Sequence, residues 1–391
     1  MVGSGVNERG GLSEYGMKVS HLSLERFRNH RSTAIDLGEA VNILHGKNGH
    51  GKTNVLEGLS YISLTKSFFG AADRTVLQFG APVFFVEATI RTDAGSTHTL
   101  RVIYDDRLGE KRFTVNGVEP ERSSAVIGRF PFVVLSPEHD AVTVGGPAER
   151  RRWIDLLLSQ ISPVYLEELI EYRRALHQRN RLLLDAKLEH RSPGDLLGPW
   201  SEALVRHGTA LVLRRKEFIQ SFVERFSAVY RAIAGGSEEA SISYQSGIHS
   251  GDEPEEADVA RVFAGALERR TAEEMRRGIT LTGPHRDDLV FTLDGLNLQE
   301  YGSQGQHKTS LVALKFAEYD YLREQRNEAP QFLLDDLFSD LDAERSENIL
   351  NRLGGMGQCV ITMTDAHMFE RQLKQFSVSA FCVDSGTCRA V

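Results

Sequence analysis

Cysteine is scarce in this chain, and its placement argues against two kinds of stabilising site. Only three of the 391 residues are cysteines, and all lie in the last part of the sequence: Cys359, Cys382 and Cys388. A disulfide framework or a structural zinc site would need cysteines at paired spacing, which these do not show. We therefore expect a protein of a reducing cytoplasm.

Long hydrophobic runs are also lacking. No apolar stretch reaches the length that crosses a bilayer, and no signal-peptide pattern opens the sequence, so no membrane partner is expected. Residues 1–16 are glycine-rich and polar, which predicts a disordered tail or extension before Met17. The composition is otherwise that of a soluble globular protein, long enough for two to three domains.

An excess of positive charge is lacking as well. The chain has 46 Lys and Arg against 54 Asp and Glu, a net charge of −8. Residues 148–231 nevertheless hold 15 basic and 11 acidic side chains, so this segment carries +4 and the remainder −12. A uniformly DNA-coating protein is thereby excluded, and one basic region is predicted on an acidic protein.

The sequence does contain a phosphate-binding loop. Eight residues fit the pattern G-x-x-x-x-G-K-[ST], in which glycines let backbone N–H groups surround phosphate oxygens. A strand pattern precedes the loop and a helix pattern follows it, as the motif requires. The lysine would bind the phosphates and the threonine hydroxyl would ligate Mg²⁺. The loop consists of Gly46, Lys47, Asn48, Gly49, His50, Gly51, Lys52 and Thr53.

A second part of a nucleotide site lies near the end of the chain. The hydrophobic run 332–334 leads into Asp335 and Asp336. A strand beside the phosphate loop should offer a carboxylate to the Mg²⁺ shell, and Asp335 fits that role. Asp336 could orient or deprotonate an attacking water. Taken alone, the pair could also be an acidic strand-to-loop turn.

The pattern of elements predicts an α/β fold built from both chain ends, with a mainly helical insertion. Helical spacing covers 147–231, with breaks at Pro163 and Pro193-Gly194, and returns at 257–277, while the acidic stretch 237–256 indicates a mobile connection. We expect a first lobe at 17–140, a helical arm at 141–278 and a C-terminal part at 279–391. Strands are predicted at 19–27, 40–44, 83–90, 97–104, 130–135, 279, 289–293, 332–334 and 359–362, with an Asn116-Gly117 hairpin turn.

An S-x-G-Q segment, formed by Ser303, Gly305 and Gln306, begins the predicted helix 309–322. By itself this pattern is typical of an ordinary helix N-cap, although such a helix start can also bind an anion. The order of phosphate loop, S-x-G-Q and acidic pair resembles the ATP-binding-cassette head. In that fold the S-x-G-Q loop caps the γ-phosphate held by a partner subunit, which implies an ATP-dependent, head-to-tail homodimer.

Five further motifs, in the same order along the chain, resemble the RecF family of DNA-maintenance ATPases. The resemblance extends from Met17 to about Leu341 and so covers nearly the whole chain. The motifs are Phe27-Arg28-Asn29-His30, Asn54-Val55-Leu56-Glu57, Pro137-Glu138, the stretch from Gly145 to Asp155, and the stretch from Gly283 to Leu289.

The resemblance implies a DNA-binding ATPase of recombinational repair and replication. Such a protein acts at single-stranded gaps and their junctions with duplex DNA, where it helps to load RecA together with RecO and RecR. ATP and Mg²⁺ would drive dimerisation, and slow, DNA-stimulated hydrolysis would reverse it. The resemblance assigns phosphate and Mg²⁺ binding to Lys52, Thr53 and Asp335, hydrolysis to Asp336, and completion of the partner's site to Ser303, Gly305 and Gln306.

Some positions depart from the cassette pattern. Glutamate is usual where Asp336 stands, and the shorter side chain should place water less well and slow turnover. No histidine follows the strand at 359–362, so Thr362 or Thr364 would replace the switch histidine, because His367 lies too far along. Residues 136–139 would replace the glutamine loop, and residues 339–342 would form the loop at the dimer seam.

Basic side chains recur along the helical arm. We predict that six of them contact DNA phosphates without recognising sequence. Arginines at a helix start oppose the helix dipole, which favours an acidic partner there. The alternatives are a solvated helix face, or arginines that fold inward and tie the arm down. The six are Arg150, Arg151, Arg152, Arg214, Arg215 and Lys216, with Arg173, Arg174, Arg179 and Arg181 between them.

Other classes of phosphate-loop protein fit less well. The insertion has proline breaks and no sustained heptads, which argues against the long coiled coil of an SMC- or Rad50-like DNA tether, the nearest alternative. A transporter cassette would carry an LSGGQ-like signature and a GTPase an N-K-x-D motif, and neither occurs. The cluster His285-Arg286-Asp287-Asp288 has no second group at ligand spacing, which argues against metal binding. The resemblance implies a structural or dimer-seam role for it instead.

Overall fold

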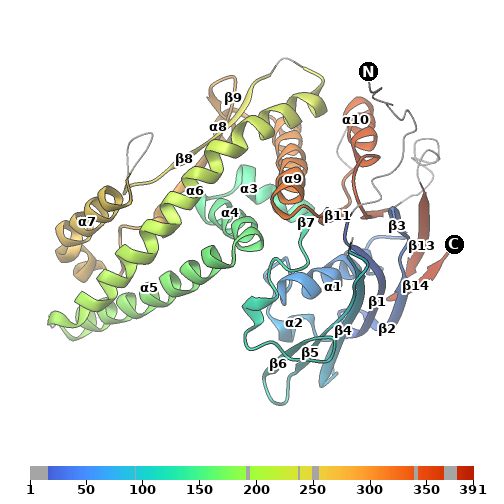
Figure 1. Cartoon of the computed structure of the whole chain (residues 1–391), viewed down its shortest axis with the longest axis horizontal. Coiled ribbons are helices and arrows are strands. Elements are labelled where there is room, and N and C mark those ends of the chain that lie inside the picture. The colour runs from blue at the N-terminus through green and yellow to red at the C-terminus, as the bar shows by residue number, and fades with distance from the viewer. Residues whose placement is uncertain are drawn as a thin grey trace, which may run out of the picture. The chain divides into compact units, whose positions relative to one another are not determined.

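The computed structural model describes residues 16–92, 94–190, 194–236, 238–248, 255–338, 342–364 and 377–391, without the side chains of Ser123 and Ala343. The chain forms two compact units: one ends at Pro137 and resumes at Glu318, and the other spans Glu138–Ala317 (Figure 1). The first unit therefore comes from both chain ends, as predicted. Except for Gly16, the expected tail at 1–16 lies outside the described residues.

The first unit contains a six-stranded sheet with the order β14-β13-β3-β12-β11-β7, parallel except between β13 and β14. Strands β3, β11 and β12 are almost wholly buried apolar runs, as expected for a parallel sheet covered on both faces. Their carboxyl ends meet at one edge. The strands are β3 (Val41–His45), β7 (Phe132–Leu135), β11 (Gln331–Asp335), β12 (Cys359–Met363), β13 (Val378–Asp384) and β14 (Thr387–Ala390).

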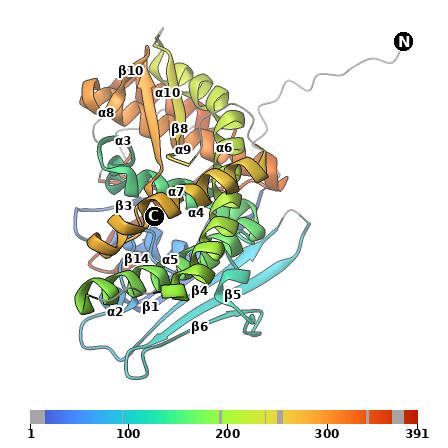
Figure 2. The same ribbon diagram turned by 90° about the vertical axis from the view of Figure 1, so that its left-hand side faces the viewer.

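The first unit also contains a five-stranded antiparallel sheet with the order β2-β1-β4-β5-β6. Its strands β4, β5 and β6 can be followed in Figure 2. The Asn116-Gly117 turn is confirmed, since both residues have positive φ, 53° and 78°, and Val115 and Val118 exchange backbone hydrogen bonds. The strands are β1 (Lys18–Phe27), β2 (His30–Asp36), β4 (Val83–Arg91), β5 (Thr97–Asp105) and β6 (Glu110–Val115).

Helix α1 (Lys52–Leu64) touches strands of both sheets. Every residue from Val55 to Leu64 is buried, because one face meets the parallel sheet and the other the antiparallel sheet. Phe27, Tyr61 and Phe84 pack edge to face, with ring centroids 5.4 to 5.6 Å apart. This packing anchors the helix that follows the phosphate loop. The short helix α2 (Asp73–Val76) and α10 (Ala343–Leu353) also belong to this unit.

Helices dominate the second unit. The predicted break at Pro163 is confirmed: α5 begins there, and the Ser162 side chain caps it by accepting a hydrogen bond from the Tyr165 N–H. None of the described helices is long and apolar enough to cross a membrane. The helices are α3 (Ala141–Val144), α4 (Pro147–Ile161), α5 (Pro163–Glu189), α6 (Leu197–Ala234), α7 (Glu256–Arg277), α8 (Leu298–Tyr301) and α9 (Gln304–Arg326), which continues into the first unit.

Two sequence expectations in this region are wrong. The stretch 237–256, expected to be a connection, contains β8 (Ala240–Gln245), which pairs with β9 (Asp288–Leu293) in a sheet completed by β10 (Leu296–Asn297). Alternation of buried Ala240 and Ile242 with polar residues makes β8 a half-buried strand of low mean hydropathy. Ile279 is not in a strand, because it follows directly on the end of α7. The β8–β9 pairing places residues 279–317 with the helical arm.

Candidate nucleotide-binding site

The phosphate loop connects β3 to α1, and its glycines are needed for its path. Gly46, Gly49 and Gly51 have φ of 151°, 79° and 107°, which disfavours any side chain. A Cβ on Gly46 would also meet the carbonyl oxygen of Val383 at 2.2 Å. The first turn of α1 has neither a capping side chain nor an acidic residue, so its N–H groups are suited to an anion.

Lys52 folds back over this loop. Its Nζ donates to the carbonyl oxygens of Gly46 at 2.7 Å and Lys47 at 3.1 Å. Burial lowers the pKa of Lys52, while the charges of Asp336 and Asp335 act in the opposite direction. The ammonium group is thus poorly hydrated and lies against the loop, where a phosphate oxygen would be a favourable partner.

Asp335 lies beside the loop, as predicted. The Thr53 hydroxyl donates to its carboxylate at 2.9 Å, and the Thr362 hydroxyl donates to the same oxygen at 2.6 Å. Burial raises the pKa of Asp335, and these two hydrogen bonds oppose the rise. Thr53 and Asp335 fit a Mg²⁺ site, because both offer oxygen and their separation matches the ~3 Å between adjacent ligands of an octahedral shell.

Asp336 follows in a left-handed conformation, with φ of 48°. Its backbone N–H donates to Thr362 Oγ1 at 3.0 Å, so one buried threonine holds both acidic residues in place. Thr364 instead donates to Asn48 in the phosphate loop at 3.3 Å. Of the two candidates for the switch position, Thr362 therefore contacts the acidic pair and Thr364 contacts the phosphate loop. Residues 339–341 of the expected seam loop, and His367, lie outside the described residues.

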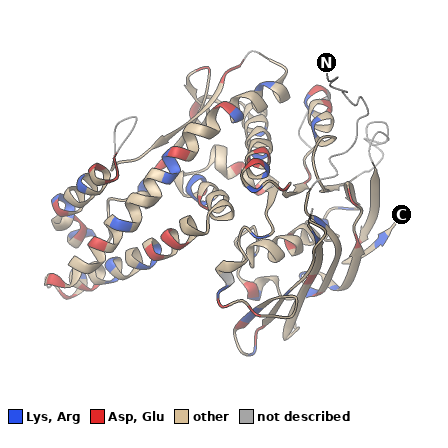
Figure 3. Cartoon of the chain, viewed as in Figure 1, with Lys and Arg blue, Asp and Glu red and all other residues tan. Residues whose placement is uncertain are grey.

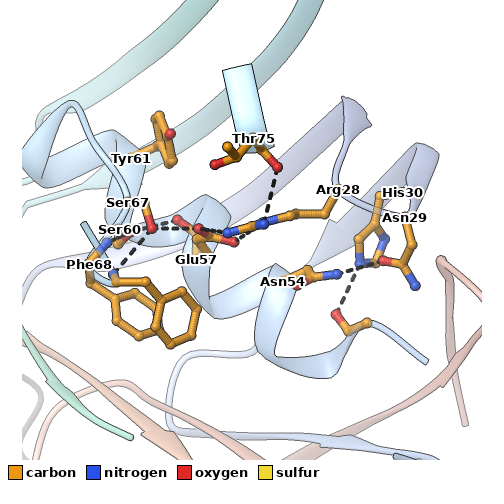
Figure 4. Close-up of polar contacts among 12 residues, drawn as sticks. Arg28, Asn29, His30, Asn54, Glu57, Ser60, Tyr61, Ser67, Phe68 and Thr75 are labelled. Carbon is orange, nitrogen blue, oxygen red and sulfur yellow. Dashed lines mark hydrogen bonds and ion pairs between the residues drawn. The ribbon is translucent and has the colours of Figure 1, made fainter. Parts of the chain in front are cut away.

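A cavity of about 930 Å³ lies next to the phosphate loop, and the sequence offered no pattern that predicts it. Its lining includes Arg28, Asn54 and Phe79, and the Phe79 ring is fully exposed. Arg28 points toward the wholly buried Glu57, to which it donates two hydrogen bonds of 2.7 and 2.8 Å (Figure 4). Two of the family-like motifs, at 27–30 and 54–57, thus meet at the wall of this cavity.

The S-x-G-Q segment lies in the second unit and forms a helix cap. Ser303 Oγ accepts from the Gln306 N–H at 3.2 Å, and Gln306 Oε1 accepts from the Ser303 N–H at 2.8 Å. This reciprocal pair is a capping box. Gln306 also donates to Glu238 at 2.7 Å, while Ser303 remains exposed. Within one chain, Ser303 and Gln306 therefore act as the N-cap of α9, which is one of the two interpretations of the sequence pattern.

The prediction that Arg150 and Arg215 contact DNA is wrong. Arg150 is 3% exposed and is held by Asp288 at 2.7 and 2.9 Å. Arg215 is 2% exposed and donates to Asp155 at 2.8 Å. Because both guanidinium groups are enclosed by carboxylates, neither is available to a phosphate backbone. At these two positions the alternative stated above is observed: the arginine side chains fold inward.

The other predicted DNA contacts differ in exposure. Arg152 and Arg214 are exposed, while Arg151 and Lys216 are half-buried. Arg151 donates to the carbonyl oxygen of Asp287 at 2.6 Å, and burial lowers its pKa. Basic and acidic residues are interspersed along α5, α6 and α7 rather than forming one uninterrupted basic stripe (Figure 3).

The His285-Arg286-Asp287-Asp288 cluster braces the second unit. His285 Nδ1 lies 2.6 Å from the Tyr172 hydroxyl, and its Nε2 lies 3.1 Å from the Thr280 carbonyl oxygen. Burial lowers the pKa of His285 to about 4, so the ring is neutral near pH 7. Tyr244 donates to the Asp287 carboxylate. These contacts show a structural role for the motif.

The phosphate loop after β3, the acidic pair at the end of β11 and the two sheets around α1 define an ATPase head of the ATP-binding-cassette class. The family model for the RecF/RecN/SMC N-terminal domain matches residues 18–383. The DNA replication and repair protein RecF of Salinibacter ruber is 42% identical over 360 residues, which cover 91% of this chain and 87% of that protein. The chain belongs to the RecF family, as the sequence motifs predicted.

Two further comparisons agree. The RecF protein of Chloroherpeton thalassium is 38% identical over 366 residues, covering 93% of this chain and 98% of that protein. A solved structure of the recombination mediator protein RecF with ATP, from the RecFOR pathway, matches with a TM-score of 0.89 at 28% identity. That match covers 96% of this chain and 98% of the solved one, so both units of this chain have counterparts there.

Proposed function

We propose that this protein binds Mg-ATP and uses it to control binding to DNA at single-stranded gaps and their junctions with duplex, in recombinational repair and replication. The observation that carries the proposal is the contact between Thr53 and Asp335. It brings the phosphate loop and an acidic residue 282 positions away to one edge of the sheet. The RecF relatives support the DNA role, and the solved ATP-bound RecF supports the choice of nucleotide.

In this proposal each residue at the edge of the parallel sheet, where the phosphate loop meets the acidic pair, has a distinct task. Lys52 and the N–H groups of the loop bind the β- and γ-phosphates, and Thr53 with Asp335 would hold Mg²⁺, which supplies charge neutralisation when bound. Asp336 accepts a proton from the attacking water. Thr362 holds the Asp335 carboxylate and the backbone of Asp336 in place. An aspartate in the base position reaches less far than a glutamate, so turnover would be slow. Stimulation of this turnover by DNA is a separate part of the proposal.

ATP would also join two copies of the chain. In this proposal Ser303, Gly305 and Gln306 complete the partner's site, since Ser303 is exposed at the start of α9. RecO and RecR would be the protein partners, as the RecFOR pathway of the solved relative suggests, and RecA loading would be the outcome. The capping box that holds Ser303 and Gln306 would present the serine hydroxyl and the helix N–H groups together.

The cavity beside the loop would take the nucleoside of ATP, with the exposed Phe79 ring against the base. Replacing Phe79 with alanine should weaken ATP binding about tenfold, because base–aromatic stacking contributes roughly 1–3 kcal/mol. Binding of Mg-tripolyphosphate, which has no base, should not change. Isothermal calorimetry with both ligands measures the difference. Equal affinity of both proteins for ATP would place the base elsewhere.

The exposed Arg152 and Arg214 and the half-buried Lys216, on α4 and α6, would contact DNA. The triple variant Arg152→Ala, Arg214→Ala, Lys216→Ala should bind a gapped duplex more weakly, and the slope of log affinity against log salt should fall by up to about 3. Fluorescence anisotropy at several salt concentrations measures both. Arg261→Ala is the matched control, since it too is an exposed arginine paired with an acid three residues away. An unchanged slope would mean that these side chains form only a solvated face.

A further inference from the structure

We propose that two tight turns from opposite ends of the chain brace the phosphate loop and orient its peptide groups. The first turn, Arg28-Asn29, joins β1 to β2, and the second, Ser385-Gly386, joins β13 to β14. Asn29 is the principal positioning residue, and His30 and Thr33 extend the brace. The inference depends on the proposed nucleotide binding at this loop, and it concerns residues for which that proposal has no task.

The carbonyl oxygen of His50, in the phosphate loop, accepts a hydrogen bond from each of the two turns. The Asn29 side-chain amide donates to its oxygen at 3.0 Å, and the backbone N–H of Gly386 donates to the same oxygen at 3.0 Å. Because a trans peptide is planar, the N–H of Gly51 must point opposite to this carbonyl, away from the two turns. The two hydrogen bonds to the His50 carbonyl oxygen thus fix the direction of the Gly51 N–H, which we propose binds phosphate.

The next peptide group of the loop is held in the same way. His30 is wholly buried, and its Nε2 lies 3.0 Å from the carbonyl oxygen of Gly51 (Figure 4). Its Nδ1 lies 3.0 Å from Thr33 Oγ1, and the Thr33 hydroxyl donates to the carbonyl oxygen of Gly386 at 2.8 Å. The two turns are therefore bonded to each other as well as to the loop.

The turns leave no room for larger residues. A Cβ on Gly386 would meet the carbonyl oxygen of Asn29 at 2.1 Å, and a Cβ on Gly51 would meet Asn29 Oδ1 at 2.5 Å. His50 Nδ1 also lies 3.0 Å from Asp384 at the end of β13. Packing of this kind orders the N–H groups before a phosphate arrives, so binding does not have to order them.

Asn29 also lines the nucleoside cavity, and a direct contact with the nucleoside is the competing explanation. The two explanations differ for a ligand that has phosphates but no nucleoside. We would measure Mg-ATP and Mg-tripolyphosphate by calorimetry with the wild type, Asn29→Ala and Thr33→Val. Ser32→Ala is the matched control, since Ser32 is an exposed residue on the same hairpin.

The brace predicts that Asn29→Ala weakens both ligands by the same factor, about tenfold, as expected for loss of its hydrogen bond to the His50 carbonyl oxygen. The variant also removes Oδ1, which accepts a hydrogen bond from the Asn54 side chain at 2.8 Å. Thr33→Val, which keeps the side-chain shape, should weaken both by a smaller common factor, and Ser32→Ala should bind as the wild type. Ser32→Ala should keep the wild-type melting temperature, whereas Asn29→Ala and Thr33→Val should lower it modestly, because each removes hydrogen bonds within the brace. Binding is therefore compared at a temperature at which every variant is folded.

Unchanged binding of tripolyphosphate by Asn29→Ala and Thr33→Val would overturn the brace. Loss of ATP affinity alone would overturn it in favour of a nucleoside contact. If the wild type bound neither ligand, the proposed nucleotide function would itself be wrong, and the brace would be rejected with it. Failure of the brace and failure of the function therefore give different results.

Discussion

Asp336→Asn should bind Mg-ATP with nearly wild-type affinity but hydrolyse it at least about 100-fold more slowly, because a general base contributes that much or more. The change removes the proton acceptor and keeps the size of the side chain. The backbone N–H of residue 336 still donates to Thr362, so the loop should keep its conformation. Phosphate release measures turnover, and light scattering in Mg-ATP and in Mg-ADP measures the mass of the complex.

If ATP joins two heads, Asp336→Asn should be a dimer with Mg-ATP and a monomer with Mg-ADP. Asp36→Asn, an exposed carboxylate on β2, is the control and should hydrolyse ATP as the wild type does. Hydrolysis by Asp336→Asn at the wild-type rate would exclude residue 336 as the base. A monomer under every condition would argue against ATP-driven pairing and leave Ser303 with its capping role alone.

Arg215→Ala should destabilise the second unit by about 3–5 kcal/mol, since it removes the buried cation between Asp155 and Asp287 and leaves Asp155 with the more exposed Arg173 as its partner. Arg215 lies between Asp155, at 2.8 Å, and Asp287, at 3.8 Å, and both carboxylates are almost wholly buried. Its Nη1 also donates to the carbonyl oxygen of Pro284 at 2.8 Å. For a unit of this size the loss corresponds to about 10 °C in melting temperature.

The neighbouring Arg214→Ala is the matched control. Arg214 is 61% exposed and pairs with the exposed Glu217 along its own helix, so its removal should change the melting temperature little. Scanning fluorimetry of the two variants compares them directly. A stable Arg215→Ala protein that has lost DNA affinity would contradict the buried role and restore Arg215 as a phosphate contact.

Local patterns predicted much of the nucleotide site. The loop from Gly46 to Thr53 is one continuous segment, and its glycines, lysine and threonine each have a task that follows from residue type. Asp335 could also be placed, because parallel strands end at a common edge and a carboxylate there must face the loop. The contact of Thr362 with the Asp335 carboxylate and the Asp336 backbone could not be predicted, since a threonine at a strand end has no distinctive signal.

The basic arm shows the opposite case. Arg214 and Arg215 are adjacent and chemically identical, yet they point about 100° apart around a helix, one to solvent and one to the core. Which of them is buried depends on Asp155 and Asp287, which come from α4 and the segment before β9. No pattern within α6 identifies partners so far away along the chain.

Local sequence patterns were sufficient to predict a RecF-family head with a phosphate loop, an acidic pair and a split α/β domain. Each of these motifs is a short run of residues whose role depends on its own spacing. The burial of particular arginines, the strand β8 and the contacts of turns from both chain ends with the phosphate loop became apparent only in the folded chain. Those features arise from contacts between distant segments, and such contacts exist only once the sheets and helices have packed.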